Sequence, residues 1–206
     1  ADLMKASNWT SSNVLLYDST MLHGNFGAWI EGNAVVSPQG EMLDILRVDN
    51  KASLNEKAAI VKISKDGKTA EFDRDKGFVD FPGGSKKFSI LYDHKSKLYW
   101  TISNYIPEEV KSANQGRNPA GIRNTQALFS SKDLLTWDLR KVLLQHPDVA
   151  KHGFQYLDFL FEGKKNIIFL SRTAYDDGQG GARNNHDANY LTFHRIKNFR
   201  KIAVQK

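Results

Sequence analysis

A six-residue turn sequence occurs twice in this chain, and its spacing limits the folds that the chain can adopt. Residues 64–69 (SKDGKT) recur 67 residues later as residues 131–136 (SKDLLT), and Trp137 closes the second copy. Repetition at a fixed period indicates a unit of supersecondary structure that is used more than once. The aspartate of each turn can accept hydrogen bonds from backbone N–H groups, and the tryptophan can pack beneath the hairpin. We therefore interpret Asp66 and Asp133 as structural residues.

Short apolar runs of strand length lie between the turns. Runs of this kind that flank turn residues are typical of β-hairpins. They occur at 34–36 with 42–48, at 58–63 with the turn that follows, at 88–92 with 98–102, and at 156–161 with 167–171. No apolar stripe of helical period lasts three turns, and the best helix candidate is the short segment 107–112. The pattern predicts an all-β chain.

The repeat and the hairpins together predict a β-propeller of four-stranded blades, of which about three fit into this chain. We place them at residues 31–73, 87–144 and 154–196 of one propeller portion that spans residues 1–206. Three blades leave sheet edges exposed, so we expect the portion to belong to a larger, six-bladed propeller. Either missing N-terminal blades or a second chain would complete the ring. Because the chain opens with Ala1 and not with methionine, we expect residues upstream of it.

Composition and charge narrow the classes of partner. With 40% hydrophobic and 25% charged residues the chain has the profile of a globular protein. Its net charge of +6 favours an acidic partner, but the lysines and arginines are scattered and match no nucleic-acid motif. No apolar run approaches the ~20 residues that span a bilayer. The absence of cysteine excludes disulfides, zinc–thiolate sites and a thiol nucleophile.

Two stretches resemble a known enzyme family. Residues 131–137 (SKDLLTW) resemble the Asp-box turns of sialidases and, equally, a turn of five-bladed glycosidases that act on arabinans, xylans and fructans. Residues 31–47 (EGNAVVSPQGEMLDILR) are similar to a sialidase pattern in which a glutamate opens a strand and an arginine closes the returning strand. In that family the glutamate polarises a nucleophilic tyrosine, and the arginine belongs to a group of three that holds the sugar carboxylate.

Two further stretches extend the resemblance. Residues 123–131 (RNTQALFSS) resemble the strand that carries the family's third arginine, and residues 154–159 (FQYLDF) lie where the family places its tyrosine. The resemblance therefore implies a sialidase-like (neuraminidase superfamily) propeller, of which this chain holds the C-terminal blades. It implies Glu31 and Tyr156 as catalytic residues and Arg47 and Arg123 as ligands of the substrate carboxylate. It also favours a periplasmic or secreted location.

The chemistry of an acidic sugar fits these residue types. A neutral tyrosine avoids the repulsion that the substrate carboxylate would exert on an anionic nucleophile. Arginine can bind a carboxylate through two parallel hydrogen bonds. Asp158 is an alternative site carboxylate, because residues two apart on a regular strand share a face with each other, here with Tyr156.

A loop near the end of the chain supplies further candidates. We expect His186 and Asp187, which follow the glycine-rich segment 176–181, to contact sugar hydroxyls. The acidic and histidine residues here match no cation-loop spacing, so we predict no metal and no cofactor.

Three functions stay open at this point. The first is a sialidase-like glycoside hydrolase that cleaves a terminal, acidic sugar from a glycan. The second is a five-bladed type of glycosidase with Glu31 as its general acid. The third is a carbohydrate-binding propeller without catalysis. All three have a glycan as partner, and none involves nucleic acid.

Overall fold

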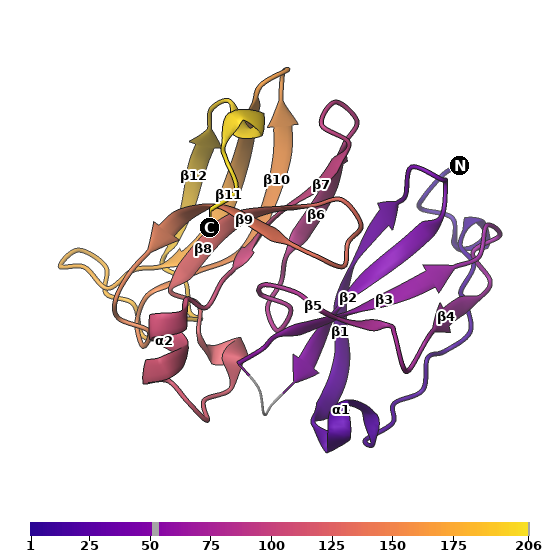
Figure 1. Cartoon of the computed structure of the whole chain (residues 1–206), viewed down its shortest axis with the longest axis horizontal. Coiled ribbons are helices and arrows are strands. Elements are labelled where there is room, and N and C mark those ends of the chain that lie inside the picture. Colours follow the sequence, from indigo (N-terminus) through magenta and orange to yellow (C-terminus); the bar gives the residue numbers. More distant parts are fainter. Residues whose placement is uncertain (51–53, 206) are drawn as a thin grey trace.

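The regular structure of the chain consists mainly of three antiparallel β-sheets (Figure 1), and the computed structural model describes residues 1–50 and 54–205. The first sheet contains β1 (Phe26–Val36), β2 (Met42–Asn50), β3 (Lys57–Ile63), β4 (Ala70–Phe72) and β5 (Phe78–Asp80). The second contains β6 (Ser89–Asp93), β7 (Leu98–Asn104), β8 (Thr125–Ser131) and β9 (Asp138–Gln145). The third contains β10 (Gly153–Glu162), β11 (Asn166–Ala174) and β12 (Tyr190–Ile196).

Helices contribute little. The described residues contain α1 (Met21–Gly24), α2 (Glu108–Ala113) and short 3-10 helices at Ala6–Asn8, Pro119–Gly121 and Phe199–Lys201. The prediction of an all-β chain is therefore confirmed, and α2 lies where the sequence suggested a short helix. No helix in residues 1–50 or 54–205 is long and apolar enough to cross a membrane.

The first and third sheets differ from a simple four-stranded meander. β4 pairs with residues 61–63 of β3, and β5 pairs with residues 57–59 of the same strand, so two short strands share the fourth position. The third sheet has three strands within the described residues. After β12 the chain turns at Asn198 into the last 3-10 helix, and the backbone N–H of Gln205 donates to Leu139 of β9. The chain thus returns to the second sheet instead of adding a strand to the third.

The two turns of the sequence repeat have the mechanics expected of them. In the second turn, one carboxylate oxygen of Asp133 accepts hydrogen bonds from the backbone N–H groups of Leu135 and Thr136, both at 2.9 Å. Trp137 then packs edge-on against Phe81, with ring centroids 5.0 Å apart. These contacts fix the hairpin, which is the structural role expected of Asp133.

The sheets pack face to face, and the second sheet is buried on both sides. The core between the first and second sheets contains Val35, Leu43, Ile45, Ala58, Val79, Phe81, Phe88, Ile90, Tyr99 and Leu134. The core between the second and third contains Trp100, Ile102, Leu128, Leu157, Phe159, Ile167, Phe169, Ile196 and Phe199. All seven residues of β8 are buried, which explains why this strand lacks the polar–apolar alternation of a half-exposed strand.

The outward faces of the two end sheets differ. A third apolar cluster around Phe26, Val48 and Ala59 covers the first sheet, with Trp29 and Phe72 packed against it. On the third sheet, large apolar side chains stay exposed, namely Leu160, Leu170, Leu191 and Phe193. Leu170 lies directly opposite Phe193 in the pairing of β11 with β12, so both side chains point outward from the same face.

An ion pair ties the end of the chain to the second sheet. Arg200 donates two hydrogen bonds to Asp93, both at 2.5 Å. Burial by itself would raise the pKa of Asp93, but the hydrogen bonds from Arg200 and Ser96 outweigh burial and hold that pKa well below its usual range. The 3-10 helix at Phe199–Lys201 is thereby fixed against the turn between β6 and β7.

We expect Asp93→Asn to lower the free energy of unfolding by about 2–3 kcal/mol at neutral pH, because Arg200 loses its anionic partner. The folded-state pKa of Asp93 is lower than the unfolded value of about 3.9, so the pair stabilises above that pH and loses its contribution as the pH falls below it. The difference between wild type and variant should therefore shrink from pH 7 to pH 3 in urea unfolding. Glu162→Gln, which breaks a more exposed pair with Arg195, should cost clearly less, because solvent screens an exposed pair. Equal losses for Asp93→Asn at both pH values would contradict the assignment.

Candidate functional site

Tyr156 lies at a β-bulge near the start of β10. The pairing of β10 with β11 shifts register between Gln155 and Asp158, so that two residues of β10 face one residue of its partner. Tyr156 itself has a φ of +48°, a left-handed conformation that is uncommon for a residue with a bulky side chain. Strained residues of this kind concentrate at binding and catalytic sites.

Two arginines lie over the ring of Tyr156. The guanidinium carbons of Arg123 and Arg172 are 5.6 Å and 5.0 Å from the ring centroid, within the range of cation–π attraction. Arg123 also donates to the side-chain oxygen of Gln155 at 2.8 Å, and Arg172 donates to the backbone carbonyl of His186 at 2.7 Å. Arg123 comes from the segment before β8 and Arg172 from β11. Both guanidinium groups are held in place by residues of the third sheet or of its β11–β12 loop.

A third arginine joins this group from the first sheet. Arg47 is buried, donates to the backbone carbonyl of Ser85 at 2.8 Å and forms an ion pair with Glu31 at 3.0 Å. Burial lowers the pKa of Arg123, and the positive charges of Arg47 and Arg172 lower it further, although Tyr156 partly opposes this. An arginine nevertheless keeps its charge at any ordinary pH, so the three cations coexist at close quarters. We call Arg47, Arg123 and Arg172 the arginine cluster.

A fully buried lysine lies next to the arginine cluster. The ammonium of Lys86 donates to the Glu56 carboxylate at 2.5 Å and to the carbonyl of Pro119 at 3.2 Å. Burial lowers the pKa of Lys86; Glu56 opposes that shift, while Arg123 and Arg47 add to it. Glu56 also accepts hydrogen bonds from the backbone N–H groups of Gly83 and Ser85, at 3.0 Å and 3.3 Å. The pair therefore fixes the segment between β5 and β6, on which Arg47 in turn depends.

The charges of this region favour an anion. The cations are the arginine cluster and Lys86, and the carboxylates near them are Glu31, Glu56 and Asp187. Cations outnumber carboxylates, and Lys86 is already bound to Glu56. The planar guanidinium group of arginine can form two parallel hydrogen bonds to the two oxygens of a carboxylate.

His186 and Asp187 reach Tyr156 from the loop between β11 and β12. The Tyr156 hydroxyl lies 3.4 Å from Nε2 of His186, and Nδ1 of His186 lies 3.4 Å from the Asp187 carboxylate. Hydrogen bonds from Asn184 and from His186 lower the pKa of Asp187. Both side chains are well exposed, so they border the site on its solvent side.

Most of the residues predicted from the sequence thus come together, with two differences. Arg47, Arg123, Tyr156, His186 and Asp187 form one connected group, as described above. Glu31 joins it through Arg47, whereas the described contacts of the Tyr156 side chain are with His186, Arg123 and Arg172.

Asp158 is the second difference. It accepts hydrogen bonds from Ser89 Oγ at 3.0 Å and from the backbone N–H of Phe159 at 2.9 Å. Its assignment to the face of Tyr156 assumed regular alternation, and the bulge interrupts that alternation. The described contacts of Asp158 lead to β6 and not to the arginine cluster.

Sequence reasoning missed Arg172 and the Lys86–Glu56 pair. Arg172 stands near the end of the second strand of its sheet, the same position that Arg47 has in the first sheet, so comparison of the two hairpins could have found it. No sequence signal marked Lys86, because a lysine beside a second lysine normally indicates a solvated surface. Across residues 1–50 and 54–205, no three histidine or acidic side chains gather in a way that could hold a metal ion.

Known proteins were similar to this chain in structure and not in sequence. No protein-family model and no curated protein matches the sequence. An α-L-arabinanase of Penicillium chrysogenum, solved with arabinobiose, is similar with a TM-score of 0.54 and 12% identity, over 88% of this chain and 49% of the other. An α-L-arabinofuranosidase of Fusarium graminearum, solved with an iminosugar inhibitor, has a TM-score of 0.55 and 11% identity, over 93% of this chain and 50% of the other.

The chain spans about half the length of these two structures. At such low identity the likeness shows the fold alone, which is that of β-propeller glycosidases, and it confirms the predicted propeller portion. The two enzymes are arabinan-type glycosidases by name and not sialidases. The sialidase resemblance therefore stays a prediction.

We expect Lys86→Met to lower the free energy of unfolding by about 3–5 kcal/mol, because it leaves the Glu56 carboxylate buried without a cation. Lys57→Met is the matched control, since it breaks the exposed pair between Lys57 and Asp80 and should cost less than about 1 kcal/mol. Denaturant unfolding of both variants measures the difference. A similar small loss for the two would show that the buried pair contributes little.

Proposed function

We propose that this chain supplies three blades of a carbohydrate-processing propeller and that the site at Tyr156 receives the anionic group of an acidic sugar. The observation that carries the proposal is the placement of Arg123 and Arg172 over the strained Tyr156, with Arg47 near Arg123. A carboxylate placed between Arg123 and Arg172 would relieve the repulsion among the three guanidinium groups. A neutral ligand would leave that repulsion in place.

Hydrolysis of a sialidase-like kind fits the same geometry. The Tyr156 oxygen would attack the anomeric carbon and release its proton to a neighbouring base, while the bond to the leaving oxygen breaks and that oxygen takes up a proton from water. Water would then attack the anomeric carbon, break its bond to the Tyr156 oxygen and return a proton to the tyrosine. His186 Nε2, 3.4 Å from the Tyr156 hydroxyl, is better placed as this base than Glu31, whose described contact is with Arg47. Glu31 then holds Arg47 toward the substrate.

A carbohydrate-binding role without turnover is the second candidate. The observation that favours it is the long separation of Tyr156 from His186 together with the pairing of Glu31 to Arg47, which keeps Glu31 from acting on the tyrosine. In the five-bladed alternative, Glu31 would have to leave Arg47 in order to protonate a leaving group.

The proposal also includes at least one further blade, which would pack against the third sheet. The exposed Leu160, Leu170 and Phe193 give the third sheet an apolar outward face, like the faces that are sealed between the described sheets. Another blade, supplied by a second chain or by more of the same polypeptide, would bury it. The solved relatives are about twice as long, which is consistent with such a complement.

Calorimetric titration with N-acetylneuraminic acid, its 2,3-unsaturated analogue and glucuronate tests the binding step. We expect Arg172→Gln and Arg123→Gln to weaken binding about 10- to 100-fold, because each removes a charge-assisted contact to the carboxylate. Arg195→Gln is the matched control, since Arg195 pairs with Glu162 away from the cluster, and it should leave the Kd unchanged. Binding of none of the three acids by the wild-type chain would overturn the proposal.

Turnover separates the two candidates. If the chain hydrolyses a sialoside substrate, Tyr156→Phe should abolish kcat by removing the nucleophilic oxygen while retaining the ring beneath the arginines. The Kd for the unsaturated analogue should change by less than about threefold, because the charge contacts remain. Binding without hydrolysis in the wild type would favour the binding module, and unchanged turnover in Tyr156→Phe would show that the tyrosine is not the nucleophile.

A further inference from the structure

A separate cavity lies between the first and second sheets, away from the arginine cluster. Its volume is about 570 Å³, in the range of small-molecule sites. Its walls come from the segment before β3, the end of β5, the end of β7, helix α2, and β8 with the turn that follows it. None of Arg47, Arg123, Arg172 or Tyr156 lines it.

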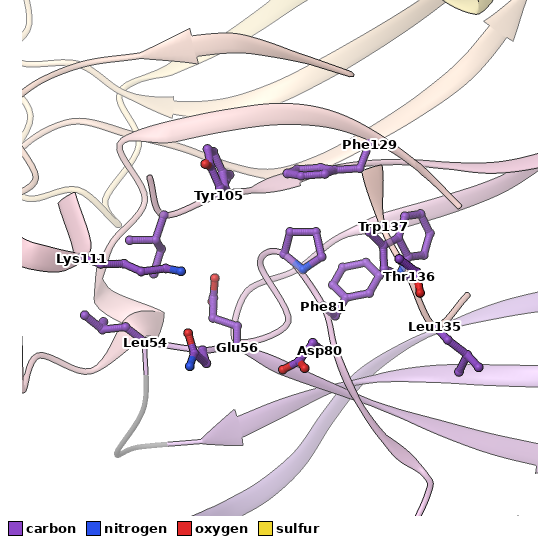
Figure 2. Close-up of a pocket in the computed structure, with 13 residues that line it drawn as sticks. Leu54, Glu56, Asp80, Phe81, Tyr105, Lys111, Phe129, Leu135, Thr136 and Trp137 are labelled. Atoms are coloured by element: carbon purple, nitrogen blue, oxygen red, sulfur yellow. The ribbon is translucent and has the colours of Figure 1, made fainter. Parts of the chain in front are cut away.

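Aromatic rings form much of the wall. Figure 2 shows Tyr105 and Phe129 on one side of the cavity, Phe81 and Trp137 on another, and Lys111 across from them. Each pair of rings packs edge to face, with centroids 5.7 Å apart for Tyr105 and Phe129 and 5.0 Å for Phe81 and Trp137. Phe81 and Phe129 are buried, whereas Tyr105 and Trp137 keep part of their surface. The two outer rings thus offer apolar surface backed by a rigid core.

The charged groups around the cavity are balanced. The three that line it are each paired, Glu56 with Lys86, Asp80 with Lys57, and Lys111 with Glu108. A charged ligand would have to displace one of these partners. A neutral ligand would not, and a carboxylate in an ion pair still has lone pairs free to accept hydrogen bonds from hydroxyl groups.

Neutral sugars match the two features of this cavity, namely its aromatic walls and its paired charged groups that can still form hydrogen bonds. One face of a sugar ring carries C–H groups that pack on an aromatic ring, while the rim carries hydroxyl groups. The Asp80 carboxylate is largely exposed and can accept from such hydroxyls, and the Lys111 ammonium can donate to them. Burial raises the pKa of Tyr105, so its hydroxyl keeps its proton and can donate as well.

We propose that the cavity between the first and second sheets is a second carbohydrate site, specific for a neutral mono- or disaccharide. It is distinct from the acidic-sugar site, because neither Tyr156 nor any member of the arginine cluster lines the cavity and because the two have different charge balances. In a propeller that acts on a glycan, this cavity would hold a neutral part of the chain outside the reacting centre.

Titration followed by the indole N–H signals in ¹H–¹⁵N NMR spectra tests the proposal. The probes are xylobiose, cellobiose and arabinobiose, each added to about 20 mM, well above the Kd of a millimolar site. We expect the Trp137 signal to shift and saturate with at least one probe, and the signal of Trp9, which lies outside the cavity, to stay in place. No shift of Trp137 with any of the three sugars would overturn the proposal.

Two variants localise the binding. Asp80→Asn changes an exposed group and should keep the fold while weakening the Kd about three- to tenfold; Tyr105→Ala should weaken it tenfold or more. Tyr17→Ala is the matched control, because that tyrosine packs on Phe26 at the other face of the first sheet. Unchanged affinity in both Asp80→Asn and Tyr105→Ala would contradict the assignment.

A cross-test keeps the two sites distinct. Arg123→Gln should leave the Trp137 titration by the neutral sugar unchanged, whatever it does to the binding of acidic sugars. If Arg123→Gln abolished the shift of Trp137, the neutral sugar would be binding at the arginine cluster and the second site would be rejected. Failure of the acidic-sugar titration alone would leave the result at Trp137 as it stands.

Discussion

The buried ion pair between Lys86 and Glu56 is the contact on which the functional end of this chain depends. Its carboxylate holds two backbone N–H groups of the segment between the first two sheets, and its ammonium reaches the carbonyl of Pro119 in the segment before β8. Ser85, fixed in this way, receives Arg47. Two buried charges stabilise a structure only when hydrogen bonds replace their lost hydration, and here Glu56 and Lys86 bond to each other, to two backbone N–H groups and to one carbonyl. The pair also forms the wall between the arginine cluster and the cavity lined by Trp137.

The hairpins, the turns and the fold class could be predicted from the sequence because they depend on local patterns. Alternating short apolar runs and a repeated Ser-x-Asp turn have few other structural meanings. The individual site residues were harder to predict from the sequence, because contacts between different sheets bring them together. Arg123 and Tyr156 came from a family resemblance, and comparison of two hairpins could have found Arg172, whereas the role of Lys86 depends on the packing of loops on one another. The placement of Asp158 on the face of Tyr156 relied on regular alternation, which the bulge between Gln155 and Asp158 interrupts.

The two sides of the Lys86–Glu56 wall have opposite electrostatic character. Toward β10 the surroundings hold more cations than carboxylates, and every guanidinium group is positioned by a backbone carbonyl or a side-chain oxygen. Toward α2 the three charged side chains that line the cavity each have a partner of opposite sign, and aromatic rings form much of the remaining wall. One chain thus contains a cation-rich region and a charge-balanced one.

The left-handed backbone of Tyr156 sets stability and function against each other. Holding a bulky residue in that region costs about 1–3 kcal/mol, which the packing of the third sheet must offset. Glycine would remove the strain at once, and selection for stability alone would therefore favour it. A tyrosine at this position is the pattern expected if its side chain takes part in the proposed site. Among proteins with this bulge, the residue at the strained position should thus separate lineages that keep the site from lineages that have retained only the scaffold.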